Sequence, residues 1–507
     1  MNFQQNSSYE PVNQCDFPKK QFLVTTSSHL IYDKVLEGFR SLKGSPSELW
    51  LAYILKFLDS YSYFSFSLSM TLFLSNDFGY DDLQAGTIYG AWGSLVVLFG
   101  LTSGPLIDKL GVATSLKLGF IISFVARCLI FYTSSRVHLL LAIMLLSFGN
   151  CLGIPVLSVG IRRYTNEENR GFAFGLFYVI MNVAVLLSGP TVDLCTVYFT
   201  QVEDEQMKVR KMDTGVPEWN FSGYRLIILV GIISNAIAFF TALLVKEIKV
   251  SSPSKSELSS NEQKEIFAMG KKSTQIFQPD NSTKTTQILR ETMQSSEFWR
   301  FLAVCIITVN VRMLFRHMDA TLPKYMVREF GDNVRKGLIY SINPAIIMVL
   351  VPIVSAATTK VDPLLMISRG SCISAFSVCF LVVSTSVQSC ILFVIFLSIG
   401  EALWSPRLYD YTMKVAKEGR EGTYMALASA PLFLAKLPVG MMSGFLLEKY
   451  CPEEGPRDSK FMWLIIGLTT APSPILLRIF WKYLSKQNDL GRHATTLPIN
   501  NHKSNVI

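Results

Sequence analysis

The sequence of 507 residues is 50% hydrophobic and only 17% charged, which is too apolar for an ordinary soluble protein of this length. Its formal net charge of +9 suits Lys and Arg in the cytosolic loops of a membrane protein, because no basic patch with interleaved aromatic residues points to nucleic acid. The sequence also lacks a Gly-x-x-x-x-Gly-Lys-Ser/Thr loop, a nucleophile–base pair and metal-type cysteine spacing, which argues against a nucleotide-driven pump, an enzyme and any bound cofactor.

The apolar residues occur in blocks of about 20, the length at which an α-helix spans a bilayer. We therefore predict an all-α membrane protein with twelve transmembrane helices in two six-helix bundles. The predicted order is a polar cytosolic tail (1–45), a first bundle (46–246), a flexible Ser- and Lys-rich linker (247–295), a second bundle (296–486) and a polar tail (487–507). The helices are expected near 49–74, 83–103, 112–132, 137–160, 173–192, 224–245, 298–326, 337–358, 363–384, 389–413, 423–447 and 461–484.

The distribution of Lys and Arg sets the expected orientation. Basic residues such as Lys109, Arg162 and Arg163 fall in loops on the side of both tails, which predicts that both termini are cytosolic. The sequon at Asn220 would then face outward and be available for glycosylation. We expect a monomer in the lipid bilayer, and the sequence does not distinguish the plasma membrane from an endolysosomal membrane.

A polar hinge, residues 104–111, separates two of the longest apolar runs. It resembles the loop between helices 2 and 3 of the major facilitator superfamily, Gly-x-Leu-x-Asp-Arg/Lys-x-Gly, although the basic pair that normally follows is Val112-Ala113 here. The matching residues are Gly104, Leu106, Asp108, Lys109 and Gly111. The resemblance implies two bundles that rock about a midplane site. Asp108 would then act as a gate at the N-terminus of helix 11, near Gly422, with Arg162 and Arg163 as nearby partners.

Several ionisable residues are predicted to lie deep in the membrane, where such residues usually mark a substrate or proton pathway. Arg312, Arg316 and Asp319 share one face of a helix, so they must line a wet cavity or pair with one another. The alternative is a set of fixed ion pairs between helices. The deep candidates are Lys56, Asp59, Arg312, Arg316, His317, Asp319, Glu401 and Lys436. Arg127, which is more isolated, is expected to reach the outer surface.

Two further stretches are similar to the proton-dependent oligopeptide transporters, a branch of the same superfamily. Residues 174–182 resemble that branch's Phe-Tyr-x-x-Ile-Asn on helix 5 and end in Asn182, for which a hydrogen bond between helices is the alternative role. Residues 400–406 resemble its Gly-Glu-x-x-x-Ser-Pro on helix 10, which implies that Glu401 helps to hold a peptide amine.

Other positions depart from that branch. Its Glu-x-x-Glu-Arg-Phe on helix 1 corresponds to residues 56–61, where only the second acid remains, as Asp59, and Ser60 replaces the arginine. A helix-4 lysine is replaced by Ile154. The parts that couple protons and clamp a peptide carboxylate are therefore largely absent or moved.

The sequence thus predicts a secondary active transporter of a small organic solute, either a peptide, an amino acid or an organic anion, coupled to protons and working by alternating access. The small excess of deep positive charge suits an anionic group on the substrate, and Asp59, His317 or Glu401 could carry the coupled proton. The alternative is a facilitator-like sensor or scaffold that binds a solute without moving it. Symport, antiport and facilitated diffusion are not distinguished.

Overall fold

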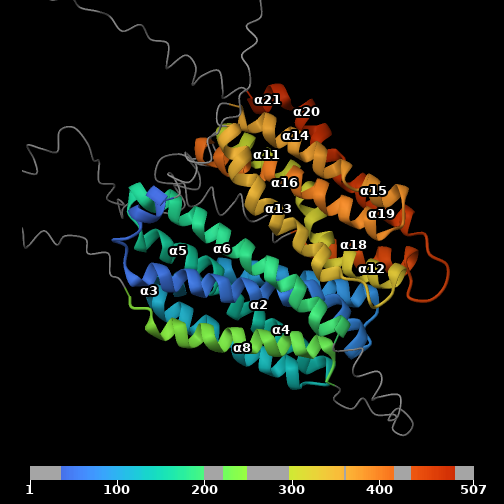
Figure 1. The fold of residues 1–507 in the computed structure, drawn as a ribbon, viewed down its shortest axis with the longest axis horizontal. Helices are drawn as coiled ribbons and strands as arrows, with labels where there is room; N and C mark the ends of the chain where they lie inside the picture. Colours follow the sequence, from blue (N-terminus) through green and yellow to red (C-terminus); the bar gives the residue numbers. More distant parts are fainter. Residues whose placement is uncertain (1–35, 199–220, 248–295, 359–360, 416–434, 486–507) are drawn as a thin grey trace, which may run out of the picture. The chain divides into compact units, whose positions relative to one another are not determined.

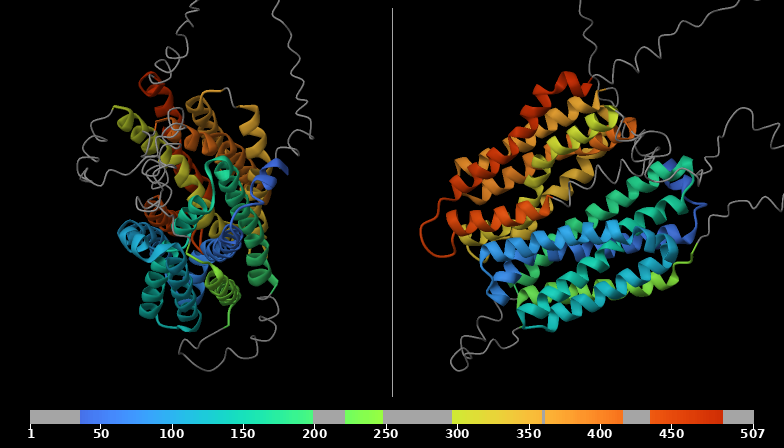
Figure 2. Two further views of the ribbon diagram at one scale, coloured as in Figure 1. Left: turned by 90° about the vertical axis from the view of Figure 1, so that its left-hand side faces the viewer. Right: turned by 180° about the vertical axis from the view of Figure 1, so that it is seen from behind.

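The computed structural model describes residues 36–198, 221–247, 296–358, 361–415 and 435–485. The chain divides after Ser45 into two units, and the second contains the helical bundles. Figure 1 shows helices α2 to α8 in one bundle and helices α11 to α21 in another, and Figure 2 shows the same two groups, blue to green and yellow to red, from two further directions.

The first bundle consists of α2 (Ser47–Phe78), α3 (Asp82–Tyr132), α4 (Arg136–Cys151), α5 (Ile154–Tyr164), α6 (Glu167–Asp193), the π-helical turn η1 (Leu194–Tyr198) and α8 (Gly223–Leu244). The second consists of α11 (Ser296–Ala320), α12 (Leu322–Phe330), α13 (Lys336–Ala357), α14 (Pro363–Phe376), α15 (Cys379–Val383), α16 (Val387–Val415), α18 (Lys436–Tyr450), α19 (Ser459–Thr470), α20 (Pro472–Ile479) and α21 (Trp481–Ser485).

The helical content agrees with the predicted membrane spans. Within the described residues, 10 helical segments are long and apolar enough to cross a membrane. The two other predicted spans correspond to α2, which is rich in serine and carries several charges, and to α18, whose predicted beginning lies outside the described residues.

Prolines explain two breaks that divide a predicted span into two helices. A proline inside a helix lacks an N–H and clashes with the carbonyl four residues earlier. Pro155 accordingly follows the end of α4 at Cys151, and Pro323 follows the end of α11 at Ala320. The second break leaves Asp319 in the last turn of α11.

The turn that the sequence predicted over residues 104–111 is not formed. Helix α3 continues through this stretch, and the backbone leaves the helical conformation only at Gly111, at φ 78° and ψ 174°. A positive φ of this size strongly favours glycine. The carboxylate of Glu247 accepts the next two backbone N–H groups, from Val112 at 3.1 Å and from Ala113 at 2.7 Å, and so caps the segment that follows the kink.

The two bundles meet along two seams, α3 against α18 and α6 against α13. Glycines bring the backbones together in both. An added Cβ on Gly86 would lie 2.1 Å from the carbonyl oxygen of Gly440, and one on Gly189 would lie 2.1 Å from that of Gly337. Small residues at such contacts allow helices in a membrane to approach closely.

Candidate functional site

A buried carboxylate, that of Asp319, lies between the two bundles. Its Oδ2 is 3.1 Å from Nη1 of Arg316, which stands one turn earlier on α11. From the first bundle, the hydroxyl of Tyr89 donates to the same oxygen at 3.0 Å and that of Ser67 at 3.3 Å. Asp319 is 1% exposed, so this carboxylate is stabilised by one cation of its own helix and by two hydroxyl groups of the other bundle.

Two more of the predicted residues, Lys436 and His317, make contacts near Asp319. Lys436 connects the two bundles, and His317 connects two helices of the second bundle. The ammonium of Lys436, on α18, donates to the hydroxyl of Tyr63 on α2 at 2.7 Å. His317 Nδ1 is 2.7 Å from the hydroxyl of Thr321, which in turn donates to Ser443 on α18 at 2.7 Å. Arg316, His317, Asp319 and Lys436 are therefore brought into one region, whereas the other candidates lie within single bundles.

In the first bundle, Lys56 and Asp59 are both buried, and the Lys56 ammonium lies 4.8 Å from the centre of the Phe177 ring. The expectation for Arg127 was wrong. Its side chain is 1% exposed, and its Nη2 donates to the carbonyl oxygen of Ser62, one turn from Asp59, at 3.1 Å. The sequence indicates how deep an arginine lies along its helix, but the packing of α3 against α2 turns this one inward.

In the second bundle, the guanidinium of Arg312 lies 5.5 Å from the centre of the Trp404 ring. Glu401 Oε2 accepts a hydrogen bond of 2.9 Å from the amide of Asn343 on α13. Asn182, on α6, donates at 2.9 Å to the carbonyl oxygen of Tyr178, four residues earlier on its own helix, and not to another helix.

One end of the interface is closed by an ion-pair cluster that sequence reasoning missed. Asp82, at the start of α3, is 2.7 Å from the ammonium of Lys324 and 2.7 Å from the guanidinium of Arg328, both on α12. Arg328 makes a second bond to the carboxylate at 2.8 Å, so it binds in a bidentate manner. We call this cluster the Asp82 latch. The spacing of Lys324 and Arg328 by four residues, on one helix face, is the only signal in the sequence for it.

A second contact closes the same end along the other seam. Asp193, the last residue of α6, accepts the backbone N–H groups of Gly337 at 2.7 Å and Leu338 at 2.8 Å. These groups belong to the first turn of α13, whose N–H donors have no partner within the helix. A carboxylate of the first bundle therefore caps a helix of the second.

The opposite end contains the residues predicted to act as a gate. Arg163, at the end of α5, pairs with Glu247 at 3.1 Å, and Arg162 is exposed beside it. Gly104, Asp108 and Lys109 fall within α3, but the side chains of 103–109 lie outside the described part of the structure. The expected partner region of Asp108 within 416–434 and the sequon at Asn220 also lie outside it.

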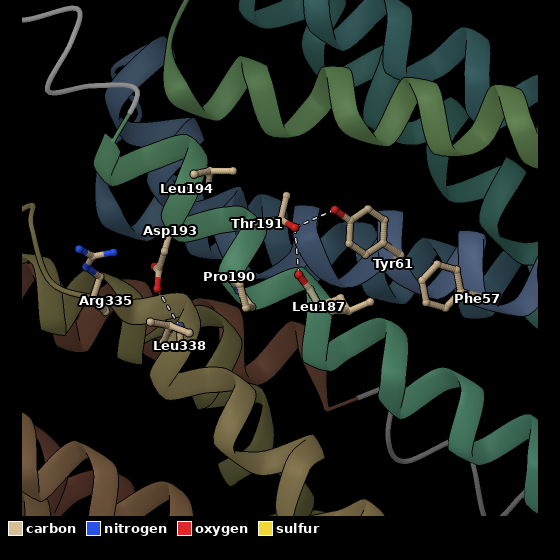
Figure 3. Close-up of a pocket in the computed structure, with 9 residues that line it drawn as sticks. All are labelled: Phe57, Tyr61, Leu187, Pro190, Thr191, Asp193, Leu194, Arg335 and Leu338. Atoms are coloured by element: carbon tan, nitrogen blue, oxygen red, sulfur yellow. Dashed lines mark hydrogen bonds between the residues drawn. The ribbon is translucent and has the colours of Figure 1, made fainter.

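A cavity of about 600 Å³ opens beside the α6–α13 seam (Figure 3). Its wall is mainly apolar or aromatic, and Asp193 and Arg335 lie toward one end of it. The lining residues are Phe57, Tyr61, Leu187, Pro190, Thr191, Asp193, Leu194, Arg335 and Leu338. None of the residues predicted to bind substrate lines this cavity, so it is separate from the charged site.

Comparisons with known proteins agree with this architecture. A model of the Major Facilitator Superfamily matches residues 49–436. No curated protein matches the sequence.

Several solved structures share the fold. One is a POT family transporter in complex with 5-aminolevulinic acid, with 15% identity, a TM-score of 0.65, and coverage of 87% of this chain and 98% of that one. Another is a POT family transporter in complex with a thioalcohol-conjugated peptide, with 15% identity, a TM-score of 0.66, and coverage of 89% and 100%. A third comes from work on substrate recognition in proton-dependent oligopeptide transporters, with 15% identity, a TM-score of 0.61, and coverage of 87% and 99%. At this identity the likeness concerns the fold.

Proposed function

Because this chain belongs to the major facilitator superfamily and is a multi-pass membrane transporter of that family, we propose that it moves a peptide, an amino acid or a small organic anion by alternating access, coupled to protons. The observation that carries the proposal is the buried set of charges around Asp319, which lie on the second bundle and are met by hydroxyl groups of the first. A charge in a membrane protein is costly unless it is paired or reached by water, so such a set is the expected place for a charged solute or proton.

The two ends of the interface support alternating access. The Asp82 latch and the Asp193 cap both connect the first bundle to the second at one end. With both termini in the cytosol, this end faces outward, and the conformation is the one closed to the outside. When the bundles rock, these contacts would break, and the opposite end would close around its own gate. We assign that gate to Gly104, Asp108, Lys109, Gly111, Arg162 and Arg163.

Four of the charged residues divide into two groups with separable roles. Arg312 and Arg316 supply positive charge for a carboxylate or another anionic group of the substrate. Asp59 and Glu401, each buried or half-buried in one bundle, are the proposed proton carriers. Because one similar structure contains a thioalcohol-conjugated peptide, we would test peptides first.

The direct test is uptake by the full-length protein in liposomes, with and without an inward proton gradient, across a panel of dipeptides, amino acids and organic anions. Glu401→Gln should reduce gradient-driven uptake by about 10–150-fold, the effect of losing an interaction of about 1.5–3 kcal/mol with a charged group. Glu448→Gln, at an exposed position of α18, is the matched control and should behave as wild type. Uptake by Glu401→Gln that is normal and still accelerated by the gradient would contradict its role, and solute binding without flux would favour the sensor or scaffold.

A further inference from the structure

The ammonium of Lys436 is enclosed by three aromatic rings of the other bundle. It lies 4.8 Å from the ring centre of Tyr63 on α2, and 4.7 Å and 4.2 Å from those of Tyr89 and Trp92 on α3. Lys436 and Trp92 are each 0% exposed. We call the three rings the aromatic box. Every wall of the box belongs to the first bundle, and the cation inside it belongs to the second.

The box, and not a carboxylate, is the immediate partner of this cation. In the portion of the chain that is described, no carboxylate oxygen lies within ion-pair distance of the Lys436 ammonium. The nearby Asp319 is already bound by Arg316 and Tyr89. A cation enclosed by aromatic rings is the arrangement by which proteins recognise ammonium ligands.

The Lys436 side chain reaches the box by passing over Gly93 of α3. A Cβ on Gly93 would lie 2.2 Å from Lys436 Cδ, so the missing side chain of α3 makes the channel through which the lysine passes. One turn earlier, a Cβ on Gly90 would lie 2.7 Å from Cα of Leu437. The lysine therefore reaches the rings only while α3 and α18 remain in close contact.

We propose that the aromatic box is an ammonium-binding site of the transporter. Lys436 occupies the box while the Asp82 end of the interface is closed. Separation of the bundles withdraws Lys436, and the box then takes a primary or quaternary ammonium group of the solute. This inference rests on the proposed function and narrows the substrate class to amines and zwitterions. Because the solute and Lys436 exclude each other from the box, binding of an amine also favours opening at the Asp82 end.

The test is equilibrium binding of radiolabelled tetramethylammonium to the purified full-length protein, with unlabelled tert-butanol as an uncharged competitor of similar shape. Lys436→Met removes the internal competitor and should bind the probe at least about 10-fold more tightly than wild type. Lys436→Arg keeps a cation in the box and should show no such gain. Trp92→Leu in the Lys436→Met background should lose the binding, because it removes the ring nearest to the cation. Tert-butanol should not compete.

A second route covers the case in which Lys436→Met fails to fold. Gly93→Ala displaces the lysine stem without changing a charge, and it should raise the affinity for the probe in the same direction. Equal affinity in wild type and in a folded Lys436→Met or Gly93→Ala protein would overturn the proposal. Amine flux that survives Trp92→Leu would also overturn the proposal that the box binds the solute, while leaving the carrier function intact. Probe binding to the box without flux of any solute would instead count against the proposed function alone.

Discussion

Removal of the Asp82 carboxylate should open the end of the protein that it closes. The side chains of the latch are nearly buried, with exposures of 7% for Asp82, 3% for Lys324 and 10% for Arg328. Asp82→Asn would leave two cations facing each other at this buried position. Loss of one partner from a buried ion pair costs about 3–5 kcal/mol.

This cost applies mainly to the closed conformation, because separation of the bundles returns Lys324 and Arg328 to water. At about 1.4 kcal/mol for each factor of 10, the ratio of open to closed molecules should rise by roughly 150-fold or more. If about 99% of the molecules are closed in the wild type, the variant should be between about half open and mostly open. A complete reversal of the equilibrium, from about 1:99 to 99:1, would take about 5.5 kcal/mol.

A cysteine at Thr71 can report this opening. Thr71 is 2% exposed, and its hydroxyl faces the carbonyl oxygen of Ala320 on α11, at 3.5 Å, across the interface. In a background without the exposed native cysteines, the rate at which a membrane-impermeant thiol reagent modifies Thr71→Cys should rise by about 50–100-fold on addition of Asp82→Asn, as the shift in population requires.

The matched control is Asp81→Asn. Asp81 caps α3 by accepting the N–H of Gln84 at 2.7 Å, and asparagine caps a helix about as well, so the modification rate should not change. If Asp82→Asn and Asp81→Asn gave the same rate, the latch would not hold this end closed.

Three other perturbations test the seams and the kink. Gly189→Ala, whose Cβ would lie 2.1 Å from a backbone oxygen of the other bundle, should raise the Thr71→Cys rate at least 10-fold, and Gly175→Ala, with open space on the same helix, should not. Asp193→Ala removes a helix cap worth about 0.5–2 kcal/mol and should shift the same assay by a smaller factor, of about 2–30-fold; no shift would mean that the cap is dispensable. Gly111→Ala should lower the thermal stability of the purified protein, because a non-glycine residue at φ 78° costs about 1–2 kcal/mol and its Cβ would lie 2.6 Å from Cδ of Glu247; an unchanged melting temperature would show that α3 can straighten there.

Much of the fold was predictable from the sequence, because the bilayer imposes a local rule. A segment that crosses hydrocarbon must be apolar over about 20 residues and must bond its own backbone, so composition alone marks the spans. The same reasoning identified Asp319, Glu401 and Lys436 as groups that lipid cannot solvate. It also marked residues 104–111 as a break between two apolar runs, although the backbone of α3 leaves the helical conformation at Gly111 alone.

The tertiary structure decided which of these groups meet. Asp319 and Tyr89 are 230 positions apart in the chain, and Lys436 and Tyr63 are 373 positions apart. Neither pairing leaves a local pattern in the sequence. Arg127 shows the limit most clearly, since its depth was predictable while its inward direction was not. Hydropathy depends on a residue and its neighbours along one helix, whereas the partner of a buried charge depends on how the faces of separate helices pack.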